Sequence, residues 1–216
     1  AFVEAYKEAG DSPPAKDQGT GGKKSDFHRT ESSLLDQAKL AFWGRQKNSK
    51  RRDQREGKDY YATPEPIGLK MAEWLQLKPN DHAAETSAGH GAIARWFPNF
   101  SRNTFIEQSY SLAGELKMLG NGDVKHEDFL NFRPARNFEG IAMNPPYGSG
   151  GSDAIKHFAR GYSMLRNGGR IVALIPDGGS ATKRFDDWFQ SENGKDARLI
   201  AEISLPNSTF KNAGTS

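Results

Sequence analysis

The sequence contains no cysteine, which excludes disulfide bonds and metal sites built from thiolates. A chain without thiols fits a reducing compartment. No run of about 18 apolar residues occurs, so no transmembrane helix is expected, and residues 1–30 lack the apolar segment of a signal peptide. These absences favour a cytoplasmic protein that does not contact a membrane.

Apolar residues are scarce in general, since they make up 35% of the 216 residues and the mean hydropathy is −0.78. We therefore expect part of the chain to lie outside a packed core. The net charge of +3 and the pI near 9.0 are only mildly basic and give weak support for a nucleic-acid partner. The pattern has no obvious stop at either end, and we expect the chain to be part of a longer polypeptide or complex.

Residues 1–59 are expected to form a basic N-terminal extension. Residues 10–26 are almost entirely Gly, Pro, Ser and charged residues, which is typical of a linker or a disordered segment. Residues 31–56 carry apolar side chains at helical spacing and predict one helix. Residues 45–58 hold seven Lys or Arg against two acids. They either bind phosphates or form a solvated helix face.

Residues 60–216 alternate between short apolar runs and helical stretches. The patterns predict strands at 82–85, 104–107, 141–143, 170–176 and 198–205, and helices at 67–77, 92–97, 111–119, 154–165 and 185–189. Strands that alternate with helices indicate an α/β domain with a mostly parallel sheet. Because ligands bind at the carboxyl ends of such strands, the residues that follow each strand are the candidates for a site.

Three segments at strand ends could contact a cofactor. Residues 85–91 (ETSAGHG) form a Gly-rich turn that lets a backbone approach a ligand, although many such turns are only structural. Glu107 ends the next strand and could accept hydrogen bonds from a ribose, or could be a solvated acid. Asp128 and Phe129 could bind and stack on an adenine, or could be a capping acid and a core aromatic. No phosphate-binding loop is present, because the Gly-Lys-Ser/Thr ending is missing.

The most specific signal is Asn144-Pro145-Pro146-Tyr147, which follows an apolar strand. Two prolines fix the backbone and remove two hydrogen-bond donors. The Asn144 side-chain oxygen and the Pro145 carbonyl can both accept from a planar primary amine, drawing its lone pair out of conjugation. Tyr147 offers a face on which a flat ring can stack, including a base turned out of a duplex. The segment predicts an amino-group methyltransferase site.

The order of these motifs resembles that of S-adenosylmethionine-dependent DNA adenine N6-methyltransferases, as in restriction-modification systems and helicase-linked phage proteins. The resemblance covers about residues 60–216 and implies a Rossmann-like class I methyltransferase domain, encoded by a bacterium or phage, whose last hairpin strand is missing. It assigns catalysis to Asn144, Pro145, Pro146 and Tyr147, and cofactor contacts to Tyr61, Thr63, Glu85, Ser87, Gly89, Gly91, Glu107, Asp128 and Phe129. It implies DNA as the partner. No metal is expected, because the five histidines lack ligand spacing and methyl transfer needs none.

Two alternatives stay open from the sequence. The same motif resembles that of RNA adenine methylases and of enzymes that methylate a glutamine amide in proteins, and cytosine N4 is a further planar amine. The second alternative is a module of a larger nucleic-acid machine that no longer catalyses the reaction. Thr86 motivates it, because the family usually has proline after the first acid. The weakly apolar strand at 81–84 motivates it as well.

Overall fold

A computed structural model describes residues 33–48, 62–206 and 209–210, with the backbone alone for 44–48. Tyr61, the Gly- and Pro-rich stretch 10–26 and most of the basic stretch 45–58 lie outside the described residues. Residues 32–216 group as one compact unit. The boundary expected near residue 60 therefore stays a prediction.

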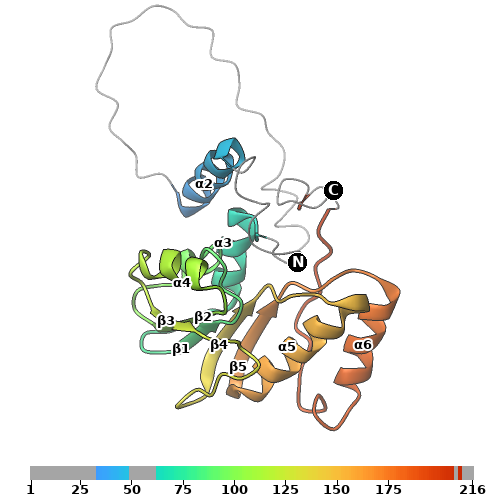
Figure 1. The fold of residues 1–216 in the computed structure, drawn as a ribbon. Coiled ribbons are helices and arrows are strands. Elements are labelled where there is room, and N and C mark those ends of the chain that lie inside the picture. The colour runs from blue at the N-terminus through green and yellow to red at the C-terminus, as the bar shows by residue number, and fades with distance from the viewer. Residues whose placement is uncertain (1–32, 49–61, 207–208, 211–216) are drawn as a thin grey trace, which may run out of the picture. The chain divides into compact units, whose positions relative to one another are not determined.

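Five strands form one sheet in which every neighbouring pair is parallel. The spatial order is β3-β2-β1-β4-β5, so the chain starts in the centre, moves to one edge and then crosses to the other (Figure 1). The strands are β1 (His82–Glu85), β2 (Arg102–Glu107), β3 (Asp123–His126), β4 (Phe138–Met143) and β5 (Leu165–Ala173). This arrangement places the carboxyl ends of β1, β2 and β4 side by side.

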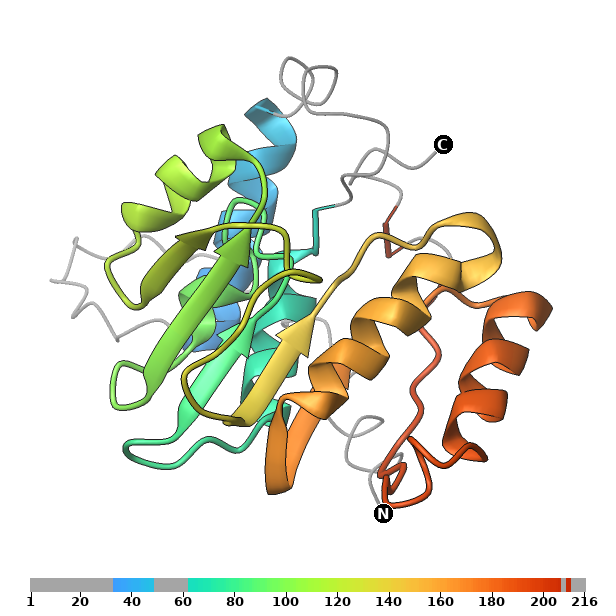
Figure 2. The same cartoon turned by 60° about the horizontal axis from the view of Figure 1, so that its bottom comes forward.

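Helices cover both faces of the sheet (Figure 2). They are α2 (Leu34–Asn48), α3 (Glu65–Trp74), α4 (Tyr110–Lys117), α5 (Ser152–Ser163) and α6 (Gly179–Phe189), with short 3-10 turns η2 (Ala94–Trp96) and η3 (Ser149–Gly151). Helix α2 contacts α3. None of the helices in the described part of the chain is long and apolar enough to cross a bilayer.

The two faces of the sheet bury separate apolar clusters, as the period of two along a strand requires. On β2, Phe105 packs with α3, η2 and α4, whereas Ile106 packs with α5 and α6. On β1, Ala83 belongs to the same cluster as Phe105, and Ala84 belongs to the same cluster as Ile106. Both alanines are fully buried. Short alanine side chains fill the centre of the sheet, so β1 is a core strand despite its weak apolar pattern.

The fold confirms the expected mostly parallel α/β architecture and corrects several elements. Residues 198–205 form no strand, so that expectation is wrong: Leu199, Ile200 and Ile203 are about half exposed or more, and the described sheet ends at β5. A strand needs a neighbour for its backbone groups, and this segment has none among the described residues. Strand β3 was not expected, and the helix expected at 92–97 is only the short turn η2.

Candidate active site

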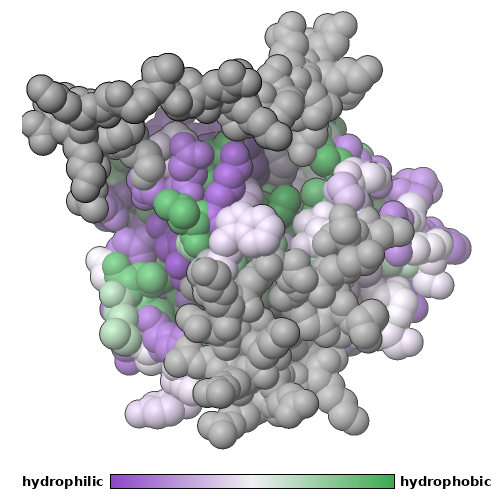
Figure 3. All heavy atoms as spheres, turned by 90° about the horizontal axis from the view of Figure 1, so that it is seen from above, coloured by the Kyte–Doolittle hydropathy of each residue, from purple (hydrophilic) through white to green (hydrophobic). Residues whose placement is uncertain are grey.

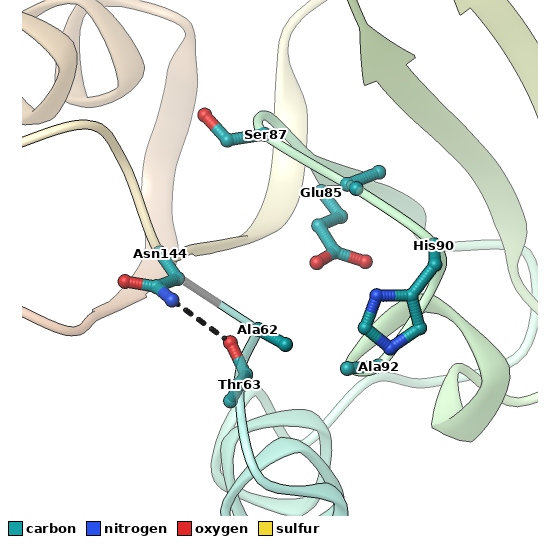
Figure 4. Close-up of a pocket in the computed structure, with 9 residues that line it drawn as sticks. Ala62, Thr63, Glu85, Ser87, His90, Ala92 and Asn144 are labelled. Carbon is teal, nitrogen blue, oxygen red and sulfur yellow. Dashed lines mark hydrogen bonds between the residues drawn. The ribbon is translucent and has the colours of Figure 1, made fainter. Parts of the chain in front are cut away.

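A pocket lies where β1 and β4 end and the segment before α3 begins. Its cavity volume is about 10 Å³, and it is lined by Ala62, Thr63, Glu85, Ser87, Ala88, Gly89, His90, Ala92 and Asn144 (Figure 4). Five of these lining residues were expected from the sequence, and the fold brings them together from positions up to 81 residues apart. A volume of this size admits about one water molecule, so the lining residues could contact only one end of a larger ligand.

The loop after β1 is held against β2 by two backbone contacts. The Ala88 amide donates to the Ile106 carbonyl at 3.0 Å, and the Gly89 amide donates to Glu107 Oε2 at 2.7 Å. Gly89 has φ 53°, a left-handed conformation that favours glycine. Gly91 has φ 85°, and a Cβ there would lie 2.5 Å from Leu119 Cδ1. Gly89 and Gly91, which were predicted as cofactor contacts, are therefore also required by the backbone conformation and packing of the loop.

Glu107 ends β2 as expected, with 8% of its surface exposed. Its Oε1 accepts from the Ser109 amide and its Oε2 from the Gly89 amide, both at 2.7 Å. Each carboxylate oxygen has a second lone pair, so the group can still accept from ligand hydroxyls. Its role in binding a ribose stays a prediction.

Glu85 is the most deeply buried acid in the pocket, at 1% exposure. Burial raises the pKa of this carboxyl well above its ordinary value, and nearby Glu107 raises the pKa further, while the Ala94 amide and Arg95 oppose the shift. Glu85 Oε2 has no hydrogen-bond partner among the described residues. A buried carboxyl oxygen without a partner is costly, and a cationic donor in the pocket would relieve that cost.

The Asn144–Tyr147 segment is held rigidly at the end of β4. The Met143 carbonyl accepts from the Leu174 amide at 2.9 Å. At the other end, the Tyr147 carbonyl accepts from the first amides of α5, those of Asp153 at 3.1 Å and Ala154 at 3.3 Å. Between these anchors Pro145 is buried, and Pro146 and Tyr147 are half-buried.

The Asn144 side chain points its nitrogen to Thr63, in the segment just before α3. Its Nδ2 donates to Thr63 Oγ1 at 3.1 Å, and its oxygen points away from Thr63 (Figure 4). Thr63 was expected as a cofactor contact. It does line the pocket, and it also touches the predicted catalytic amide.

Asp128 and Phe129 lie outside the pocket lining. Asp128 Oδ1 accepts from the Leu130 amide at 2.9 Å, which is a turn-capping contact. Phe129 is 3% exposed and its ring stacks on His157 with centroids 5.8 Å apart. The structure therefore gives both residues a structural role, and their contact with an adenine stays a prediction.

Of the other lining residues, Ala88 and His90 lie within the predicted turn 85–91, whereas Ala62 and Ala92 were not predicted as contacts. The alanines carry no signal of their own, because a small residue in a turn serves packing and ligand approach alike. Arg95 was also not predicted. Its Nε donates to the Gly91 carbonyl at 2.9 Å and so supports the loop. Its spacing of four residues from Gly91 was the available signal.

The residues present fit S-adenosylmethionine at its amino-acid end. That end carries an ammonium group and a nearby sulfonium, both positive, and Glu85 supplies a buried carboxyl oxygen without a described partner. The Ser87 and Gly89 backbone lies beside it. No group of His, Asp and Glu that could hold a metal occurs among the described residues.

The face seen from above Figure 1 is mixed in character. Where described residues form it, hydrophilic and hydrophobic side chains lie in small interleaved groups (Figure 3).

No family model matches the sequence, and no curated protein matches it. Solved structures do match. A protein from Listeria monocytogenes assigned as a class I S-adenosylmethionine-dependent methyltransferase aligns over 74% of this chain and 60% of its own, with 12% identity and a TM-score of 0.57. A protein from Pyrococcus horikoshii assigned as an RNA methyltransferase aligns over 76% and 83%, with 18% identity and a TM-score of 0.55.

A third match is a modification subunit assigned to a type I restriction enzyme from Vibrio vulnificus. It aligns over 73% of this chain and 44% of its own, with 14% identity and a TM-score of 0.53. The chain thus spans less than two thirds of the Listeria and Vibrio proteins. At these identities the matches concern the fold, and the chain has the Rossmann-like fold of class I S-adenosylmethionine-dependent methyltransferases.

Proposed function

We propose that this chain transfers a methyl group from S-adenosylmethionine to the exocyclic N6 amine of adenine in DNA. One observation carries the proposal. The Asn144 amide, fixed at the end of β4, shares a pocket with Glu85 and the Gly-rich loop at 86–91. A hydrogen-bond acceptor for an amine and a candidate site for a cationic methyl donor are thereby adjacent.

The chemistry requires an amine nitrogen with an available lone pair. In adenine the N6 lone pair is delocalised into the ring, so the nitrogen is a poor nucleophile. Two acceptors, Asn144 Oδ1 and the Pro145 carbonyl, can each bind one N–H of the amine and favour a tetrahedral nitrogen. These dipoles also stabilise the positive charge that develops on the nitrogen.

When bound, S-adenosylmethionine would supply the methyl group, whose bond to sulfur breaks as the bond to the amine nitrogen forms, with the electron pair left on sulfur. The methylated nitrogen then gives up one proton, which the hydrogen bonds to Asn144 and Pro145 direct toward solvent. Glu85, Ser87 and Gly89 would hold the methionine end. Catalysis rests on positioning and fixed dipoles.

DNA is proposed as the substrate on three grounds. Tyr147 is half-buried beside the catalytic amide and provides a ring for stacking a base turned out of a duplex. The stretch 45–58, with seven Lys or Arg, is suited to phosphate contacts. A restriction-modification subunit is among the structures that share the fold.

Cofactor binding and substrate class are tested separately. Isothermal titration of the chain with S-adenosylmethionine should show binding, and isotope-labelled methyl should then appear in duplex DNA in preference to RNA or protein. Equal or greater labelling of RNA would replace the DNA assignment. Failure to bind the cofactor would instead favour the module that does not catalyse the reaction.

A further inference from the structure

The contact between Thr63 and Asn144 joins two segments that lie 81 residues apart in the sequence. Thr63 is 5% exposed, and its Oγ1 lies 3.1 Å from Asn144 Nδ2. An amide side chain has a donor end and an acceptor end of the same size. In this arrangement the donor end meets Thr63 and the acceptor end points away from it (Figure 4).

Thr63 is itself held in a rigid place. It precedes Pro64, whose carbonyl accepts from the Ile67 amide at 2.9 Å and from the Gly68 amide at 3.0 Å. A residue that precedes proline is restricted to an extended backbone conformation, and a β-branched threonine has few side-chain rotamers. The hydroxyl of Thr63 is therefore fixed relative to the first turn of α3.

Helix α3 is in turn seated against the loop that follows β1. A Cβ built on Gly68 would lie 2.4 Å from the Ala92 carbonyl oxygen, so the helix and this loop touch backbone to backbone. Thr63 thus belongs to one packed unit with the pocket loop, and its hydroxyl ties Asn144 to that unit.

We propose that Thr63 is a positioning residue for Asn144, whose hydroxyl holds the amide nitrogen so that the amide oxygen is presented to the target amine. This role rests on the proposed function and adds to it, since Thr63 had been expected only as a cofactor contact. Without the hydroxyl, Asn144 Nδ2 loses the acceptor that fixes this end of the amide to the packed unit, and the balance shifts toward presenting the donor end. A donor facing the amine would repel it rather than orient it.

The test compares Thr63→Val, which keeps the shape and removes the hydroxyl, with Thr63→Ser, which keeps the hydroxyl. At saturating S-adenosylmethionine, Thr63→Val should lower kcat about 10- to 100-fold, the loss expected from a misplaced catalytic group. KM for DNA should change little, and Thr63→Ser should restore most of kcat. Thr104→Val in β2 is the matched control, because Thr104 makes no side-chain hydrogen bond in the described part of the chain.

A second readout does not depend on activity. In ¹⁵N–¹H spectra, the Asn144 side-chain amide, assigned with Asn144→Ala, should shift and exchange faster with solvent in Thr63→Val and remain as in wild type in Thr63→Ser. Wild-type kcat in Thr63→Val, equal loss in both variants, or an unchanged amide signal in Thr63→Val would each overturn the proposal. A wild type that methylates no amine would refute the proposed function, and the amide signals would still decide whether Thr63 holds Asn144.

Discussion

Among the helix glycines that the structure describes, Gly68 should be the one at which substitution by alanine lowers the free energy of unfolding most. The Cβ added by Gly68→Ala meets the Ala92 carbonyl oxygen at 2.4 Å, its carbon at 3.0 Å and Ile93 Cα at 3.2 Å, all of them backbone atoms. Overpacking of this kind costs about 1–3 kcal/mol. The better helix propensity of alanine offsets up to about 1 kcal/mol. Because no flexible side chain can move aside, we expect a net loss of about 1–2 kcal/mol in the free energy of unfolding.

Gly114→Ala in α4 is the matched control, since a Cβ there meets no atom within 4 Å. It should gain about 0.5–1 kcal/mol from helix propensity alone. Urea unfolding of both variants against wild type measures the difference, and Gly68→Ala should also weaken cofactor binding because Thr63, which lines the pocket, lies just before α3. If the two variants shift the midpoint in the same direction, the close packing of α3 on the pocket loop is refuted.

Three further outcomes follow from buried carboxyls and from the catalytic amide. Glu85→Gln should be more stable than wild type near pH 8, because the raised pKa of Glu85 makes the wild type lose stability as pH rises above the ordinary pKa of 4.5. Urea titrations that show the same difference in unfolding free energy near pH 4 would contradict this. Glu139→Gln should lose about 1–3 kcal/mol at pH 7. Burial raises the pKa of Glu139, but hydrogen bonds from Arg166 and the His82 amide lower it overall. The difference in unfolding free energy between wild type and Glu139→Gln should therefore vanish as pH falls through that lowered pKa. A difference that does not change with pH would contradict the stabilising role of the Glu139 carboxylate. Asn144→Ala should retain cofactor affinity in calorimetry, and loss of binding would show that Asn144 holds the cofactor instead.

The sequence predicted the site best where backbone chemistry was unusual. Two prolines directly after the apolar run 141–143 placed Asn144 at a strand end, and the fold puts it at the end of β4. The structure explains why threonine can replace the usual proline of the family at position 86. The Thr86 amide donates to the Ala142 carbonyl at 3.3 Å, a hydrogen bond that proline could not form. That contact extends the pairing of β1 with β4 by one residue.

Other features were beyond a reading of the sequence. Strand β3 (Asp123–His126) has a single apolar residue, Val124, because an edge strand buries little, so its pattern does not stand out. Residues 198–205 have the opposite property: their apolar pattern is that of a strand, yet no described strand pairs with them. The bond between Thr63 and Asn144 depends on the packing of α3 and leaves no local pattern at all.

The most direct test of the account is the position of the methyl group on DNA. Wild-type chain and Asn144→Ala would each be incubated with duplex DNA and isotope-labelled S-adenosylmethionine, and the DNA would be digested and analysed by mass spectrometry. We expect labelled N6-methyladenine from wild type and a loss of at least about 100-fold with Asn144→Ala, the scale of losing a transition-state hydrogen bond. Label at another atom of the base, or equal N6 labelling by both proteins, would contradict the assignment of Asn144 as the acceptor that directs transfer to an amine.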